Sequence, residues 1–494
     1  MKVVSFTSII LVGILYVSSG LFAQERLIEV KKKTYKTTEK IKIKGEEGYL
    51  VVPENRQNPD SREIKLKYVH LKSTSPTPAT PIMYLEGGGA TCTWQAESPE
   101  DLTDWLEILE VSDLIFVDQR GNEEDEDLTY IWEGEFPTNF FLTEKAANQH
   151  YKAMVEKALP AFEQRGVDVR GYNVEEHAKD FNALATALGL DTYSIFGYSF
   201  GTTIGTYLMN LFPERIERAV LVGADAPNQA LNYPSYLDKH VDTISTIVAQ
   251  DPNLSSSIPD FSKLVERVME KLAKEPAMVT ITNPLTREEV EIPVGPFGLA
   301  IILRLDIDDA KDIPIMPRLL YTIDHGDYSM LQWFVQRRIV FGLGVAGNGI
   351  NQYLASGASE GRWARIVKEA EESLFGNAVN FPFSAAKDHW VETEMSIDPT
   401  LPIQSDIPTL FISGTLDART PPAQIHETMK GFSEAYHIEI ENAGHDQVLW
   451  NIETFDNNIP AFLKGEAISS GTSYYSDIEF FPVVGEVEGH PAVE

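Results

Sequence analysis

The stretch IFGYSFGT (residues 195–202) places Ser199 midway between two glycines, with an apolar run before it and a second one after it. Where a strand turns directly into a helix, the corner residue adopts a strained backbone, and the residues two positions away approach neighbouring backbone closely. Glycines at those two positions therefore predict a tight strand-to-helix turn that exposes the Ser199 hydroxyl above the sheet. A serine in an ordinary glycine-rich turn is the alternative, and the flanking sequence distinguishes the two.

The segments around this turn alternate between strand and helix patterns. Short apolar runs that end in glycine or a polar residue, at 81–89, 113–121 and 218–225, predict buried parallel strands. Residues 173–190 have apolar positions at helical spacing and predict a helix that leads into the strand before Ser199. Residues 48–72 predict an antiparallel hairpin at the sheet edge. This alternation predicts a mostly parallel α/β sheet flanked by helices.

The pattern changes after residue 228 and returns after residue 400. The intervening residues are mostly helical in character, as at 260–275, with a hairpin expected at 278–294. Strands of the sheet type resume at 407–414 and 436–444. We therefore predict a signal peptide at 1–23 and a core in two parts at 24–228 and 401–466. A helical cap at 229–400 is inserted before the last strands, and a tail follows at 467–494.

The N-terminus and the composition limit where the protein works and what it binds. Residues 1–23 carry one lysine, an apolar run and then small residues, which predicts a signal peptide and export to the periplasm or outside the cell. An uncleaved membrane anchor is the alternative. The net charge of −33 makes nucleic-acid binding unfavourable, and the single cysteine, Cys92, excludes an intramolecular disulfide.

A serine hydroxyl becomes a useful nucleophile only beside a base that is itself held by an acid. The chain offers both groups directly after strands, since Asp417 follows the run at 407–414 and His445 follows the run at 436–444. The order Ser199, Asp417, His445 is that of α/β-hydrolases. Asp225 also follows a buried strand and is a rival for the position of the acid.

The tetrahedral intermediate of such a reaction needs backbone N–H donors. One donor is expected from Phe200, the residue after the nucleophile. The other is expected from the glycine-rich segment EGGGA (86–90), and we assign it to Gly88. A flexible glycine turn is the alternative for that segment.

Six motifs occur in register along the chain: GYLVVPENRQNP, YLEGGGA, FVDQRGN, FGYSFGT, ISGTLDARTPP and AGHDQ. Together they resemble the prolyl-iminopeptidase and tripeptidyl-aminopeptidase family of serine peptidases over residues 47–450, including the insertion. The resemblance implies a nucleophile at Ser199, a base at His445, an orienting acid at Asp417, and an oxyanion hole at Gly88 and Phe200. It also implies removal of short N-terminal units from small peptide substrates, without a metal or a cofactor.

The chain departs from this family at two places. The family usually has Gly-Gly-Pro-Gly where this chain has Gly-Gly-Gly-Ala (87–90), and small residues where this chain has NEEDED (122–127). The acids of that run, or Asp306, Asp308 and Asp309 in the insertion, are candidates for binding a substrate ammonium group. Glu86 is a further candidate. Solvated charged loops are the alternative.

Other motifs and function classes carry less weight. GLGVAG (342–347) lies in the insertion without a surrounding βαβ unit, which argues against dinucleotide binding. HETMK, from His426, lacks the second histidine of a zinc-protease helix. A carboxylesterase on the same fold is the main alternative to an exopeptidase, because the same triad cleaves esters. A non-catalytic binding protein is a third possibility, disfavoured because the catalytic positions are all chemically competent.

Overall fold

The computed structural model describes residues 25–88, 90–122, 128–308, 311–449, 451, 454–485, 490 and 492. The predicted signal peptide, residues 1–23, lies outside these residues. Within them, none of the helices has the length and apolar content needed to cross a lipid bilayer.

Ten of the described strands form one twisted sheet in the order β1-β2-β3-β5-β4-β7-β8-β12-β13-β14. The strands from β5 to β14 in that order are parallel, and β3, β2 and β1 extend the sheet antiparallel. The strand bounds are β1 (Arg26–Lys36), β2 (Lys42–Pro53), β3 (Glu63–Leu71), β4 (Ala79–Leu85), β5 (Ser112–Val117), β7 (Tyr193–Tyr198), β8 (Ile216–Val222), β12 (Thr409–Gly414), β13 (Ala435–Glu441) and β14 (Gly471–Tyr474).

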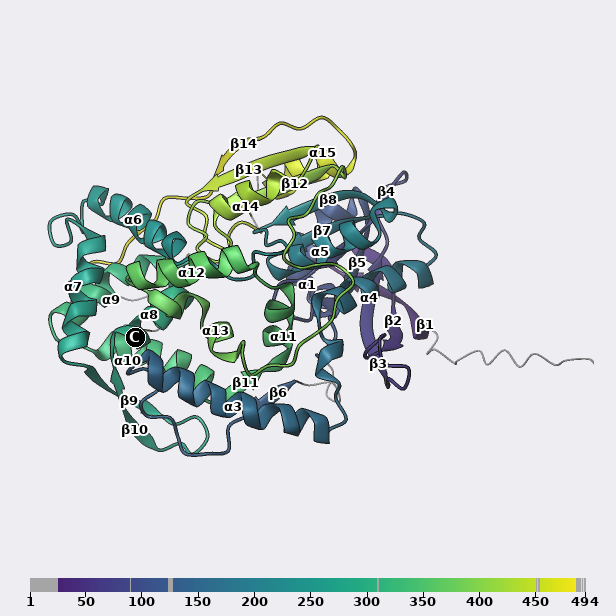
Figure 1. Cartoon of the computed structure of the whole chain (residues 1–494). Coiled ribbons are helices and arrows are strands. Elements are labelled where there is room, and N and C mark those ends of the chain that lie inside the picture. The colour runs from purple at the N-terminus through teal and green to yellow at the C-terminus, as the bar shows by residue number, and fades with distance from the viewer. Residues whose placement is uncertain are drawn as a thin grey trace, which may run out of the picture.

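Helices cover both faces of the sheet and bury its apolar side chains in two clusters (Figure 1). One face packs against α4 (Val174–Ala187), α5 (Phe200–Leu211) and α14 (Pro422–Met429). The other face packs against α1 (Pro99–Asp104), α2 (Leu106–Leu109) and α15 (Ile459–Leu463). The central strands are buried on both sides, as their continuous apolar runs require.

A second lobe, mostly helical, lies beside the sheet and has its own apolar cluster (Figure 1). Most of it comes from the segment between β8 and β12. The antiparallel strand pair β11–β6 and helix α3 also belong to this cluster, although β6 and α3 precede Ser199 in the chain. The bounds are α3 (Glu144–Gln164), β6 (Thr129–Ile131), α6 (Pro234–Gln250), α7 (Phe261–Lys274), β9 (Ala277–Thr282), β10 (Glu289–Val294), α8 (Pro296–Asp306), α9 (Met316–Asp324), α10 (Ser329–Arg338), β11 (Gly344–Ala346), α11 (Gly347–Ser356), α12 (Glu360–Glu372) and α13 (Phe383–Ala386).

The expected elements match the structure closely where apolar patterns are long. The helix expected at 173–190 is α4, the edge hairpin is β2–β3, and the hairpin expected at 278–294 is β9–β10. The segment from residue 467, which we expected to form a tail outside the core, contributes β14 to the sheet. The division of the chain into domains at residues 228 and 400 stays a prediction.

A substitution at Gly201 tests how closely α5 packs against the sheet. A Cβ atom at this position would overlap the backbone carbonyl of Leu85 at the end of β4. Because backbone cannot yield as a flexible side chain can, we expect Gly201→Ala to lower the free energy of unfolding by at least about 2 kcal/mol, measured by urea denaturation.

Gly361 is the matched control, since it also lies in a helix, α12, but a Cβ there would meet no atom within 4 Å. Gly361→Ala should leave stability unchanged or raise it by up to about 1 kcal/mol through helix propensity. An equal effect of the two substitutions would contradict the close-packing argument.

Candidate active site

The Ser199 turn has the predicted strained geometry. Ser199 follows the last residue of β7 and precedes the first residue of α5, and its φ of 51° is rare for a residue with a side chain. A Cβ atom on Gly197 would lie 2.9 Å from the carbonyl oxygen of Gly201, and one on Gly201 would overlap the Leu85 carbonyl. Both glycines are therefore required by close backbone contact.

Ser199, His445 and Asp417 form a continuous hydrogen-bonded relay. The Nε2 atom of His445 lies 2.9 Å from Ser199 Oγ, and its Nδ1 atom lies 2.8 Å from Asp417 Oδ2. The side chains of His445 and Asp417 are almost fully buried, whereas Ser199 is partly exposed. This is the geometry in which an imidazole can take a hydroxyl proton while a carboxylate stabilises the resulting cation.

Hydrogen bonds hold the Asp417 carboxylate in its ionised form. It accepts bonds from the backbone N–H groups of Arg419 (2.9 Å) and Thr420 (2.8 Å) and from the Thr420 hydroxyl (2.6 Å). Burial alone would raise the pKa of Asp417, but the charge of His445 and these hydrogen bonds outweigh it and lower the pKa to about 2. Burial opposes charge on His445 as well, yet the Asp417 carboxylate raises the pKa of His445 above its ordinary value.

Asp225, the rival acid, lies near the relay but is not part of it. Its carboxyl accepts a hydrogen bond from the side-chain amide of Gln424, and its backbone N–H donates to the Thr202 hydroxyl at 2.8 Å. Burial raises the pKa of Asp225 to about 7, and the nearby Asp417 carboxylate adds to the rise. The carboxyl that contacts His445 is that of Asp417, so the geometry favours Asp417 as the orienting acid.

The segment that we expect to donate an oxyanion-hole N–H lies against the serine. A Cβ on Gly87 would come within 2.9 Å of Ser199 Cβ, so this backbone passes directly beside the hydroxyl. Gly88 has a φ of 61°, which favours glycine. Phe200 is the first residue of α5, where helix N–H groups have no partner within the helix. The assignment of donor roles to Gly88 and Phe200 stays a prediction.

Hydrogen bonds to Glu86 hold the start of the glycine-rich segment 86–90 in place. Its carboxylate accepts bonds from the backbone N–H of Gly87 (2.8 Å) and the side-chain amide of Gln95 (3.0 Å). Its carbonyl oxygen accepts a bond from the side-chain amide of Gln119 at 2.6 Å. Burial raises the pKa of Glu86. These bonds supply rigidity that the missing proline of the Gly-Gly-Pro-Gly pattern would otherwise give, and they occupy the carboxylate that we considered for substrate binding.

Two acids of the second lobe that we considered for ammonium binding already have arginine partners. Asp306 pairs with Arg338 and, at 3.2 Å, with Arg337. Asp308 pairs with Arg419 at 2.9 Å. The remaining candidates, Asp309 and all but the first residue of NEEDED, lie outside the described residues.

Asp308 connects the second lobe to the relay, which the sequence did not indicate. Its carbonyl oxygen accepts the backbone N–H of His445 at 3.0 Å, and its carboxylate pairs with Arg419, two residues after Asp417. Asp308, two residues after the last residue of α8, therefore contacts both the loop that carries His445 and the loop that carries Asp417. The sequence holds no local signal for this contact, because residues 308, 419 and 445 meet only through the fold.

Comparison with known proteins agrees with this geometry. The family model of the alpha/beta hydrolase fold matches residues 81–270, and that of the TAP-like proteins matches residues 380–472. The chain is an α/β-hydrolase. Together with the Ser199 relay, these matches make it a serine hydrolase related to serine peptidases, as the resemblance predicted.

Relatives of this α/β-hydrolase include serine protease Hip1 from Mycobacterium tuberculosis, which is 39% identical over 82 residues, or 15% of this chain and 16% of that protein. Tripeptidyl aminopeptidase from Streptomyces lividans is 24% identical over 206 residues, or 39% of this chain and 38% of that protein. The chain thus matches well under half the length of these curated relatives.

Solved structures similar to this α/β-hydrolase include a thermophilic esterase from Thermogutta terrifontis, with 13% identity and a TM-score of 0.35 over 88% of this chain and 98% of the esterase. An epoxide hydrolase from an endophytic Streptomyces has 13% identity and a TM-score of 0.35 over 86% of this chain and 98% of that chain.

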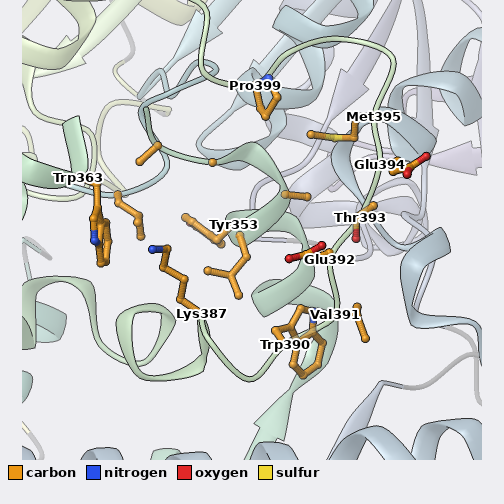
Figure 2. Close-up of a pocket in the computed structure, with 15 residues that line it drawn as sticks. Tyr353, Trp363, Lys387, Trp390, Val391, Glu392, Thr393, Glu394, Met395 and Pro399 are labelled. Atoms are coloured by element: carbon orange, nitrogen blue, oxygen red, sulfur yellow. The ribbon is translucent and has the colours of Figure 1, made fainter. Parts of the chain in front are cut away.

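A pocket of about 410 Å³ opens in the second lobe of this α/β-hydrolase (Figure 2). Trp363 and Lys387 face each other across one side, with the Lys387 ammonium 4.3 Å from the ring centre. Tyr353 lines the pocket and lies between the rings of Phe383 (4.3 Å) and Phe200 (5.4 Å), so one tyrosine joins the pocket wall to the residue after Ser199. None of the relay residues lines the pocket.

The two carboxyls near His445 are distinguished by their effects on activity. We expect Asp417→Asn to lower kcat for an activated ester such as p-nitrophenyl acetate by about 10³- to 10⁴-fold, because an amide cannot stabilise the imidazolium. Asp225→Asn should cost less than about 10-fold, because Asp225 does not contact His445. Steady-state kinetics check both, and a larger loss in Asp225→Asn would assign the acid to that residue instead.

The raised pKa of Asp225 also predicts a dependence of stability on pH. The neutral carboxyl is favoured in the folded protein, so its contribution to stability is full below about pH 4 and is lost as the pH rises through about 7. Asparagine stays neutral at every pH. The free energy of unfolding of Asp225→Asn, relative to the wild type, should therefore rise by on the order of 2 kcal/mol between pH 5 and pH 8. Urea denaturation at the two pH values measures this, and a difference independent of pH would argue against the raised pKa.

Proposed function

We propose that this α/β-hydrolase is an exported serine exopeptidase that releases short N-terminal units, either a proline or a di- or tripeptide, from small peptides. The observation that carries the proposal is that the match to TAP-like proteins, residues 380–472, contains both Asp417 and His445, which complete the relay to Ser199. Export rests on the pattern of residues 1–23.

The relay supports a two-step mechanism. His445 Nε2 takes the proton of the Ser199 hydroxyl as its oxygen attacks the carbonyl carbon of the scissile peptide bond. The backbone N–H groups of Gly88 and Phe200 bind the oxyanion that forms. His445 then gives its proton to the departing amine, which leaves Ser199 acylated by the N-terminal unit. A water molecule, deprotonated by the same imidazole, hydrolyses the acyl-enzyme.

The second lobe supports a preference for small substrates. The contacts of Asp308 with His445 and Arg419 place the end of α8 against the loops of the relay. Helix α11 brings Tyr353 against the ring of Phe200. A folded protein chain could reach Ser199 only past these elements, whereas a short peptide needs much less room.

A carboxylesterase is the second candidate, because the relay would attack an ester by the same steps. The difference between the two functions lies in the substrate amine. An aminopeptidase recognises a free ammonium group, whereas an esterase has no use for one.

A panel of fluorogenic peptide amides tests the proposal directly. Each amide, with one, two or three residues before the scissile bond, is compared with the same compound carrying an N-acetyl group. We expect cleavage of at least one free amide and a loss in kcat/KM of at least about 10-fold on acetylation, since one buried charge contact is commonly worth more than 1.4 kcal/mol. Equal rates with and without the acetyl group would support the esterase instead.

A fluorophosphonate probe serves as the control for catalysis itself. The wild-type protein should be labelled covalently at one site, and Ser199→Ala should not be labelled. A wild-type protein that is folded by circular dichroism and stays unlabelled would indicate a non-catalytic binding protein.

A further inference from the structure

Two histidines and a glutamate converge beside β13, the strand next to the edge strand β14, away from the serine relay. His426 lies in the last turn of α14, and His437 and Glu439 lie two residues apart on β13, so that they project from the same face of that strand. Each side chain offers one ligand atom, and the three atoms lie within 4.8 Å of one another. Among the described residues this is the one such group of metal-ligating side chains.

The three side chains approach one another without bonding to one another. The rings of His426 and His437 lie 5.0 Å apart at an angle of 87°. In the described part of the chain, no hydrogen bond or salt bridge of 4.0 Å or less joins the His426 and Glu439 side chains to each other or to His437. Polar atoms that converge but leave a gap between them form the arrangement expected of a ligand set, rather than of a self-satisfied polar network.

Hydrogen bonds fix the orientation of His437. Its Nε2 atom lies 2.8 Å from the Ser413 hydroxyl on β12, and its backbone N–H donates to the Ser470 hydroxyl at 2.9 Å. The Ser413 hydroxyl therefore fixes the direction of the His437 ring, as the hydrogen-bond partners of metal-bound histidines do.

We propose that His426, His437 and Glu439 bind one divalent cation of the zinc class, at a site separate from the serine relay. Two imidazoles and one carboxylate suit Zn²⁺ and leave its fourth position to water. They do not suit Mg²⁺, which prefers oxygen ligands only. The sequence of α14 alone, HETMK, lacks a second histidine at helical spacing, and the fold supplies it from β13.

The position of this cluster indicates a structural role for the cation. Helix α14 begins at Pro422, five residues after Asp417, and β13 ends at Glu441, four residues before His445. A cation held by His426 on α14 and by two residues of β13 would cross-link these two elements. Helix α14 follows the loop of Asp417, and β13 precedes the loop of His445. The cation would therefore stabilise the fold around the relay without contacting the substrate.

Titration of the full, tag-free protein with ZnCl₂ tests this site. We expect isothermal titration calorimetry and native mass spectrometry to give one Zn²⁺ per chain, and MgCl₂ to give no binding. The midpoint of thermal unfolding should rise with zinc concentration, as it does for any ligand that binds only the folded state. Co²⁺ in place of Zn²⁺ should give visible absorption bands that report its coordination geometry.

His426→Asn is the decisive variant, because His426 is exposed and its loss leaves the core intact. We expect it to weaken zinc binding by at least about 10-fold and to abolish the thermal shift. His389→Asn, a histidine outside the cluster, is the matched control and should behave as the wild type. Both variants should unfold at the wild-type temperature in the presence of a chelator. Absence of zinc binding to the wild type, or equal affinity in His426→Asn, would overturn the proposal.

Discussion

The site depends on one steric constraint, the close approach of α5 to the end of β4 beneath Ser199. Gly201 lies so close to the Leu85 carbonyl that no side chain fits there, and the turn can then place Ser199 with a φ of 51°. This strain has to be balanced by the packing of the surrounding strands and helices, because a serine has no intrinsic preference for that conformation. The buried residues on both faces of the sheet provide the packing, and the hydroxyl is held within 2.9 Å of His445 as a result.

The second lobe is connected to the relay through Asp308, and not only through the chain on either side of the insertion. Its carbonyl binds the backbone of His445 while its carboxylate pairs with Arg419, whose own backbone N–H binds Asp417. A shift of the end of α8 would therefore move both the base and the acid. This arrangement couples the second lobe, which we propose limits the access of substrate, to the positions of the catalytic side chains.

Much of the core could be predicted from the sequence because buried elements leave strong patterns. The strands β5 and β12 carry apolar runs, and Asp417 follows β12, while His445 follows the alternating strand β13, so their meeting with Ser199 could be foreseen. The edge strands β1 and β14 could not be foreseen, because they are mostly exposed and carry no apolar alternation. The role of Asp308 also escaped prediction, because its partners lie more than a hundred residues away and no local pattern encodes a contact between loops.

Two buried carboxyls near one histidine can differ in charge because their hydrogen-bond donors differ. Asp417 receives two backbone N–H groups, a hydroxyl and the imidazole, and these together outweigh the penalty of burial, so its pKa falls to about 2. Asp225 receives the amide of Gln424, which is not enough, so its pKa rises to about 7. A second full negative charge beside Asp417 would raise the affinity of His445 for a proton and oppose its return to the leaving group. Keeping Asp225 largely neutral below pH 7 therefore leaves Asp417 as the carboxylate with the largest effect on His445. This favours an imidazole that must both accept and release a proton in each turnover.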